Sequence, residues 1–129
     1  MSTKLTAFIT AYKFRKTDEE KIAFLKEHIK SDYVPFEKKA DIAKAIVQAS
    51  YYVKEKDING NEVQKFRADS IAKYMLTCMS LLDLYTDIER NKNEGKMLED
   101  FNILNEYGIF DVLIQNIQPR ELKEFNMII

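Results

Sequence analysis

Apolar residues recur every three or four positions along most of this 129-residue chain, which is the spacing of amphipathic α-helices. The chain opens on one such stripe, made of Leu5, Phe8, Ile9 and Tyr12. This stripe predicts a first helix over about residues 3–14. The same spacing continues in nearly every later window, so the sequence favours helices over strands.

Start and stop signals divide the rest of the chain into further helices. Thr17 and Glu20 have the spacing of a capping box, which predicts that a second helix begins there. Pro35 and Pro119 suit the first positions of the third and seventh helices, because proline lacks the N–H that such positions leave unpaired. A fifth helix is predicted over about residues 91–108, with Gly108 at its left-handed end, and a short sixth helix follows it.

One segment, residues 54–68, interrupts the helical pattern. Asn59-Gly60 is a signal for a tight type I′ turn, and the residues on either side could pair as a short hairpin. These flanks are charged and alternate poorly, so a mobile loop is equally compatible with them. Either form is expected to protrude from the helices.

The most apolar stretch, "YMLTCMSLLDLY" at residues 74–85, falls in a predicted fourth helix over about residues 70–89. At 100° per residue, six side chains lie within about 60° of Cys78 and define an expected core stripe: Ile71, Tyr74, Met75, Leu81, Leu82 and Tyr85. Leu76 and Leu84 lie about 160° and about 120° away from Cys78 on the same wheel. They face either other helices of this chain or a second molecule.

These elements predict a single all-α domain over residues 1–129. The fold class is a compact bundle of six or seven helices around the apolar helix at about 70–89. Only 3 glycines and 2 prolines are present, which gives little turn chemistry for a sandwich or a barrel. The apolar end "EFNMII" is unusual for an exposed terminus, so it docks internally, meets a partner, or continues beyond Ile129.

Composition narrows the class further. The content of 46% hydrophobic and 32% charged residues is that of an ordinary globular protein. One cysteine cannot form an intramolecular disulfide, and no run approaches the 18 apolar residues of a membrane span. The start of the chain lacks the apolar core of a signal peptide, so we expect no secretion by that route.

Charge is divided unevenly along the chain. Residues 1–56 carry 12 Lys and Arg against 8 Asp and Glu, a net charge of +4. Residues 57–129 carry 8 against 13, a net charge of −5. This is either ordinary variation on solvated helices or complementarity between copies that meet head to tail.

The sequence shows no catalytic motif. The single histidine, His28, has charged neighbours and is expected in a solvated last helical turn. Cys78 has apolar neighbours and is expected to be a buried, inert thiol. Asp83 and Asp87 share a helix face, but neither an EF-hand spacing nor an ExxH pair accompanies them. We therefore expect no enzyme, metal, cofactor or small-molecule substrate.

A candidate basic face lies on the first two helices, and six cations form it: Lys13, Arg15, Lys16, Lys21, Lys26 and Lys30. Acidic residues at 18–20 and 27 interrupt this face, and the isoelectric point is only about 5.9. Nucleic-acid binding is therefore possible but not favoured.

Three segments, "KTDEEKIAFLKEHIKSDYVPFEKKADIAKAIVQASYY", "AKYMLTCMSLLDLYTDIE" and "LNEYGIFDVLIQNIQPRELKEF", cover most of the chain. Their residue patterns resemble those of small helical proteins of tailed bacteriophages of low-GC Gram-positive bacteria. The resemblance implies a non-enzymatic role in virion structure or assembly, as a capsid, neck, connector or tail-assembly component in the host cytoplasm or the virion.

A protein of this kind would act through protein–protein contacts, with itself as a homo-oligomer or with other phage structural proteins. The candidate contact residues are Leu76, Leu84, Phe125, Met127, Ile128 and Ile129. The alternative is a small helical regulator that binds a host protein or nucleic acid through the basic face.

Overall fold

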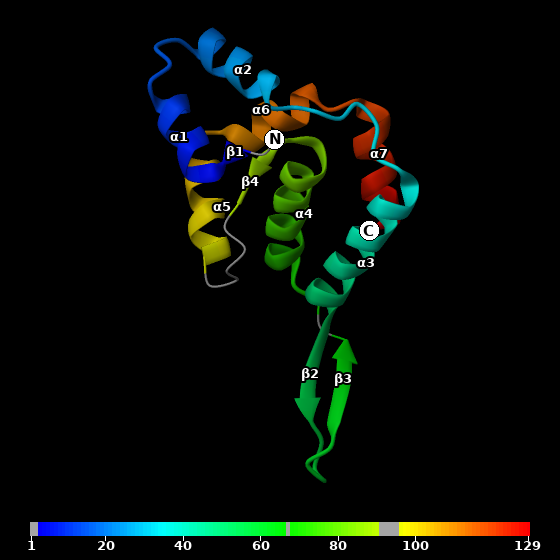
Figure 1. Cartoon of the computed structure of the whole chain (residues 1–129). Helices are drawn as coiled ribbons and strands as arrows, with labels where there is room; N and C mark the ends of the chain where they lie inside the picture. Colours follow the sequence, from blue (N-terminus) through cyan, green and yellow to red (C-terminus); the bar gives the residue numbers. More distant parts are fainter. Residues whose placement is uncertain (1–2, 67, 91–95) are drawn as a thin grey trace.

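The computed structural model describes residues 3–66, 68–90 and 96–129, and these are mostly helical (Figure 1). The described helices are α1 (Leu5–Lys13), α2 (Asp18–Glu27), α3 (Phe36–Tyr51), α4 (Ser70–Tyr85), α5 (Met97–Glu106), α6 (Ile109–Asn116) and α7 (Pro119–Ile128). The described strands are β1 (Thr3–Lys4), β2 (Tyr52–Lys56), β3 (Glu62–Phe66) and β4 (Ile88–Glu89). The mostly helical class is confirmed, and the strictly all-α class is corrected to helices with two small sheets.

Local signals in the sequence explain where several helices begin. The Thr17 hydroxyl oxygen accepts the backbone N–H of Glu20 at 3.1 Å, as the capping box predicts. The returning bond comes from the backbone N–H of Lys16 instead of Thr17, at 3.1 Å from Glu20 Oε2. Asp69 caps α4 by accepting the backbone N–H of Ala72 at 3.0 Å.

Gly108 and Pro119 also lie where the sequence places them, whereas Pro35 is the N-cap residue of α3 and Phe36 is its first helical residue. Gly108 has a φ of 66° between α5 and α6, in the left-handed region that the pattern requires. Pro119 is the first residue of α7, as predicted. The predicted start of the fifth helix at residues 91–95 lies outside the described residues, and the described helix begins at Met97.

A two-stranded parallel sheet joins the start of the chain to the segment that follows α4. Thr3 pairs with Ile88 and Lys4 pairs with Glu89. The helix predicted to reach Glu89 therefore ends at Tyr85, because the next residues are extended and bond to β1. No pattern in the sequence indicates either strand, since each has only two residues.

The break at 54–68 contains a hairpin. β2 continues directly from α3 and pairs antiparallel with β3, from Tyr52 opposite Phe66 to Lys56 opposite Glu62. Gly60, with a φ of 81°, occupies the turn. Figure 1 shows this hairpin projecting away from the helices, as either alternative required.

The core takes side chains from every described helix. In α4 the buried residues all lie in the second half of the helix: Cys78, Met79, Leu81, Leu82, Leu84 and Tyr85. The first half is more open, because Ile71 is 79% and Tyr74 is 57% exposed. The prediction that these two residues belong to the core stripe is therefore wrong.

Candidate contact surface at α3 and α7

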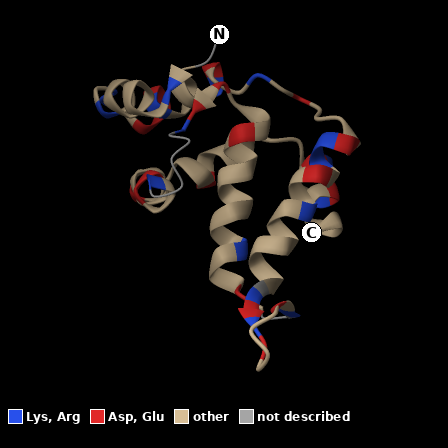
Figure 2. Ribbon diagram, turned by 60° about the horizontal axis from the view of Figure 1, so that its bottom comes forward, with Lys and Arg blue, Asp and Glu red and all other residues tan. Residues whose placement is uncertain are grey.

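A buried ion pair joins α3 to α7. Lys39 lies in the first turns of α3 and is 0% exposed, and Glu121 lies in the first turn of α7 and is 3% exposed. Lys39 Nζ lies 3.1 Å from both Oε1 and Oε2 of Glu121. Figure 2 shows basic and acidic residues gathered where α7 runs beside the start of α3. The ion pair of Lys39 and Glu121 therefore joins α3 to α7 inside the protein.

Further partners complete this buried charge cluster. Glu121 Oε1 accepts the backbone N–H of Val34 at 2.9 Å and the hydroxyl of Tyr85 at 3.0 Å. Lys39 Nζ also lies 2.7 Å from Oε1 of Glu124, whose side chain is half exposed. The cluster of Val34, Lys39, Tyr85, Glu121 and Glu124 therefore connects α3, α4, α7 and the segment before α3.

The cluster holds its two main charges in place. Burial by itself raises the pKa of Glu121, but bonds from Val34, Lys39 and Tyr85 outweigh burial and lower this pKa below its ordinary value. Burial by itself lowers the pKa of Lys39, but Glu124 and Glu121 outweigh burial and raise it. Burial and the nearby Glu121 carboxylate raise the pKa of Tyr85.

These shifts define what the cluster can do chemically. A general acid or base works best with a pKa near the ambient pH. The pKa values of Glu121 and Lys39 are moved away from neutrality, so the pair is suited to holding helices together. No pattern in the sequence indicates this pair, because 82 residues separate the two side chains and no local spacing links them.

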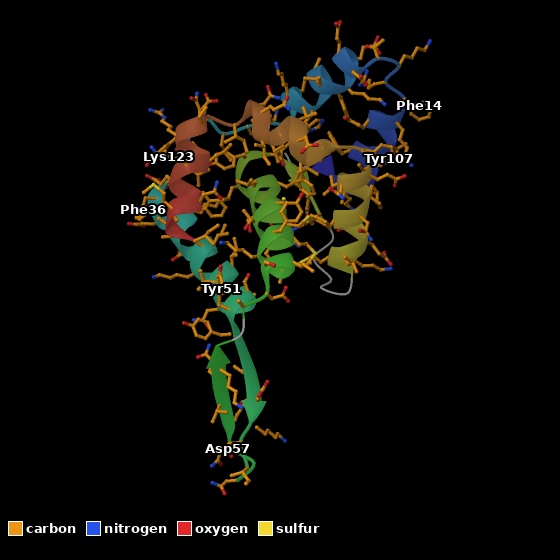
Figure 3. All side chains as sticks on the ribbon, turned by 180° about the vertical axis from the view of Figure 1, so that it is seen from behind. Phe14, Phe36, Tyr51, Asp57, Tyr107 and Lys123 are labelled. Atoms are coloured by element: carbon orange, nitrogen blue, oxygen red, sulfur yellow. The ribbon has the colours of Figure 1, made fainter. Side chains whose placement is uncertain are left out.

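A surface hollow of about 470 Å³ lies beside the buried cluster, and its lining residues are Phe36, Arg120, Lys123, Glu124, Met127 and Ile128. We call it the α3–α7 groove. Phe36 is 49% and Met127 is 76% exposed, so apolar surface faces solvent here. Figure 3 shows Phe36 and Lys123 at the same end of the molecule, on α3 and α7.

The groove also has a positive rim. Glu124 Oε1 lies 2.7 Å from Lys39 Nζ, but Lys39 also pairs with Glu121, so these three side chains together keep one negative charge. Arg120 and Lys123 outnumber that charge at the groove. Within the described part of the chain, neither Arg120 nor Lys123 makes a salt bridge. The groove therefore combines exposed apolar side chains with two available cations.

The six candidate contact residues fall into different environments. Leu84 is 5% and Phe125 is 1% exposed, so both belong to the core of their own chain and offer no surface to a partner. Leu76, Ile128 and Ile129 are half-buried and pack against the core. Met127 is exposed, and it lines the α3–α7 groove together with Ile128.

The candidate basic face is exposed over most of its cations, and several of them pack over aromatic rings. Lys13, Arg15, Lys16, Lys26 and Lys30 are exposed, and Lys21 is half-buried. Three of these cations lie over aromatic rings, with distances to the ring centroid of 5.3 Å for Lys13 over Tyr107, 4.5 Å for Arg15 over Phe24 and 5.7 Å for Lys21 over Tyr12.

The two charge halves of the sequence are interleaved in space. Helix α2 from the positive half packs against α6 from the negative half. Tyr12 of α1 meets Tyr107, which follows α5, with ring centroids 6.2 Å apart. The halves therefore do not form two separate poles, and any contact between copies must rest on smaller patches.

His28 is not in a solvated turn, contrary to the prediction. Its Nδ1 lies 2.7 Å from Oδ1 of Asp87, and both side chains are mostly buried. The rings of Phe8 and Phe24 meet the imidazole edge-on at centroid distances of 5.2 and 5.0 Å. The backbone N–H of Asp87 also donates to the carbonyl of His28, so this contact joins the end of α2 to β4.

Cys78 is buried, as predicted, with 4% exposure. Burial is the main reason that its pKa is raised, which disfavours the thiolate. Asp83 forms a two-point contact with Arg90 Nε, at 3.1 and 3.0 Å. Among the described residues, no group of three or more His, Cys, Asp or Glu side chains could hold a metal ion.

None of the described helices combines the length and apolar character that a membrane crossing requires. Comparisons with protein-family models, with curated proteins and with solved structures found no match to this chain.

Proposed function

We propose that this chain is a non-enzymatic structural or assembly protein of a tailed bacteriophage, which acts through protein–protein contacts and associates with itself. The phage context rests on the resemblance of the three sequence segments given above. It implies a place in the host cytoplasm during assembly or in the virion. Self-association rests on the α3–α7 groove.

Self-association is supported by exposed apolar side chains that lie next to two cations without salt bridges to any residue that the structure describes. Met127 and Phe36 are both exposed in a hollow whose rim is formed by Arg120 and Lys123. Contact sites of soluble proteins commonly combine an apolar centre with a polar rim. The buried pair of Lys39 and Glu121 fixes the two helices that form the walls, so the surface is held ready for a partner.

We also propose that α4 is the centre of a helical bundle. Its second half supplies six buried residues, and the Tyr85 hydroxyl extends from it into the buried charge cluster. Such a core would position α3 and α7 without needing a second chain.

Sedimentation velocity over a series of concentrations tests self-association. We expect the wild-type chain to form larger species as its concentration rises, and Met127→Asp to weaken this because it places a charge in the groove. Leu98→Asp is the matched control, since Leu98 is an aliphatic residue that is 60% exposed on α5. A wild-type chain that stays monomeric up to about 1 mM, where a binding free energy of only about −4 kcal/mol would already produce dimers, contradicts the proposal.

The phage role is tested separately from self-association. An antibody against the chain should detect it in purified particles, or in assembly intermediates, of a phage that encodes it. Its absence from both would contradict the assignment to virion structure or assembly.

A second candidate is a regulator that binds nucleic acid through the basic face. The observation in its favour is Phe14, which is 80% exposed between Lys13 and Arg15. An aromatic ring among cations can stack on a base while the cations contact phosphates. Binding of single-stranded DNA that weakens steeply with salt, and that Phe14→Ala reduces, would favour this candidate over the structural role.

A further inference from the structure

We propose that the α3–α7 groove of one copy receives the hairpin turn of a second copy, with Ile58 as the side chain that enters the groove. We define the hairpin turn as residues 57–61. This inference rests on the proposed self-association and specifies which surfaces meet.

Ile58 is an apolar side chain presented at the end of a projecting element. It is 100% exposed and lies at the far end of the β2–β3 hairpin (Figure 1). A fully exposed isoleucine gives its own fold no packing, whereas burial in a partner would remove its apolar surface from water. Its place at the end of a projecting element makes this surface available to a concave site.

The turn that carries Ile58 has a defined shape. Asp57 Oδ1 accepts the backbone N–H groups of Asn59 and Asn61, both at 2.9 Å. The backbone N–H of Asp57 donates to the carbonyl of Asn61 at 2.8 Å, and that of Gly60 donates to the carbonyl of Asp57 at 3.0 Å. These bonds hold the turn before any partner binds, which reduces the entropy lost on docking.

The α3–α7 groove matches the turn in shape and charge. Its volume of about 470 Å³ lies in the range of typical binding clefts, and Phe36, Met127 and Ile128 give it an apolar lining. The only charged side chain in residues 57–61 is Asp57. Within the described residues Asp57 makes no salt bridge, and neither Arg120 nor Lys123 does so at the groove rim.

The α3–α7 groove and the hairpin turn lie at opposite ends of the continuous segment formed by α3 and β2. A chain therefore cannot place its own turn in its own groove. Phe36 begins α3, and the hairpin follows directly from Tyr51 at the other end. The 16 residues of α3 and the 5 of β2 span roughly 24 Å and roughly 17 Å, at the usual rise per residue. Figure 3 shows Phe36 and Lys123 at one end of this unit and Asp57 at the other.

A turn on one copy meets a groove on another, so the contact is either reciprocal, in a two-fold dimer, or heterologous, in a head-to-tail arrangement. The heterologous form can repeat from copy to copy. Repetition of such a contact closes into a ring or extends into a filament, according to the rotation between copies. The contact area of a single turn is small, so each contact is expected to be weak and assembly to depend on concentration.

Two single substitutions test the inference from its two sides. Ile58→Asp blocks the turn and Met127→Asp blocks the groove; both side chains are exposed, so circular dichroism spectra should remain those of the wild type. Each variant should weaken self-association about tenfold or more in sedimentation velocity, as truncation at the centre of an interface does. Lys54→Gln, in the exposed part of β2, is the control for Ile58→Asp because it changes the net charge by the same amount.

Mixing the two variants gives the sharper test. Ile58→Asp keeps an intact groove and Met127→Asp keeps an intact turn. An equimolar mixture should therefore form a heterodimer, although each variant alone is monomeric at the same concentration. The heterodimer should not grow further, because its remaining turn and groove are both blocked.

Other outcomes overturn the inference in distinguishable ways. If Ile58→Asp associates like the wild type while Met127→Asp does not, another segment of the second copy occupies the groove. If both variants are defective and their mixture stays monomeric, the turn and the groove do not meet each other. In both cases self-association itself stands, whereas a monomeric wild-type chain would remove the proposed function as well.

Discussion

Removing the charge of Lys39 should destabilise the protein more than any ordinary surface change. Lys39→Met keeps an unbranched side chain of similar length, so the volume of the core changes little. It leaves the Glu121 carboxylate buried, with bonds from the Val34 N–H and the Tyr85 hydroxyl but no cation. Loss of one partner of a buried ion pair costs about 3–5 kcal/mol. Since single domains have unfolding free energies of about 5–15 kcal/mol, this variant should be near its stability limit.

A second substitution should reverse much of this loss. Glu121→Gln keeps an oxygen that can accept the Val34 N–H and the Tyr85 hydroxyl, and it removes the unpaired charge. In the Lys39→Met background, Glu121→Gln should therefore raise the free energy of unfolding by about 1–3 kcal/mol, the usual cost of an unsatisfied buried polar group. In the wild-type background the same change should destabilise, because it takes a charged partner from Lys39.

Urea denaturation followed by circular dichroism measures all four proteins. The coupling free energy from this double-mutant cycle should be clearly favourable, because the two side chains are in direct contact. Additive losses, with the double variant less stable than Lys39→Met alone, would refute the claim that a buried, unpaired carboxylate causes the damage.

The same pair makes a defined contribution to the pH dependence of stability. The folded pKa of Glu121 lies below its ordinary value of 4.5, so its contribution is complete above about that pH and is lost as the pH falls through the folded pKa. The folded pKa of Lys39 lies above its ordinary value of 10.5, so its contribution is present below about that pH and is lost as the pH rises further. Lys39→Met should cost less near pH 4 than at pH 7, because the carboxylate left without its cation can take a proton. An equal cost at both values would count against a charged Glu121 as the cause.

Two further predictions concern α4. Asp69→Ala should lower the free energy of unfolding by about 1 kcal/mol, since it removes the side-chain oxygen that accepts the Ala72 N–H. Urea denaturation checks this, with Asn61→Ala as an exposed control. Equal stability of the two variants would contradict the role of Asp69 as a cap. Cys78 should react with a thiol-specific disulfide reagent much more slowly in the native protein than in urea, because burial hides the thiol and raises its pKa. Equal rates would show that the second half of α4 is accessible to solvent.

The sequence predicted the helices well because their signals are local. The capping pattern of Thr17 and Glu20, the left-handed glycine Gly108 and the helix start at Pro119 each depend on neighbouring residues only. The two-residue strands β1 and β4 lack such a signal. They exist because the start of the chain meets residues 88 and 89, and that contact depends on the whole fold.

The candidate site was harder to predict, since burial of charged residues is decided by distant partners. The buried residues of α3 are Lys39, Ala43, Ile46 and Ser50. Phe36, the first apolar residue of this helix, is instead 49% exposed. The helix is rotated in this way because Lys39 reaches two carboxylates of α7, and nothing within α3 indicates that contact.

The buried pair of Lys39 and Glu121 also bears on the proposed self-association, because it joins the two helices that form the walls of the α3–α7 groove. Phe36 lies one turn before Lys39 on α3, and Met127 lies one turn after Glu124 on α7. Glu124 belongs to both features, since it lines the groove and bonds to Lys39. An apolar pair of similar volume is often at least as stabilising as a buried ion pair, so we expect the role of this pair to be the orientation of the two helices. Because Lys39 holds Glu124, and Ile128 and Ile129 pack against the core, α7 is fixed with Met127 exposed, as the proposed contact with a second copy requires.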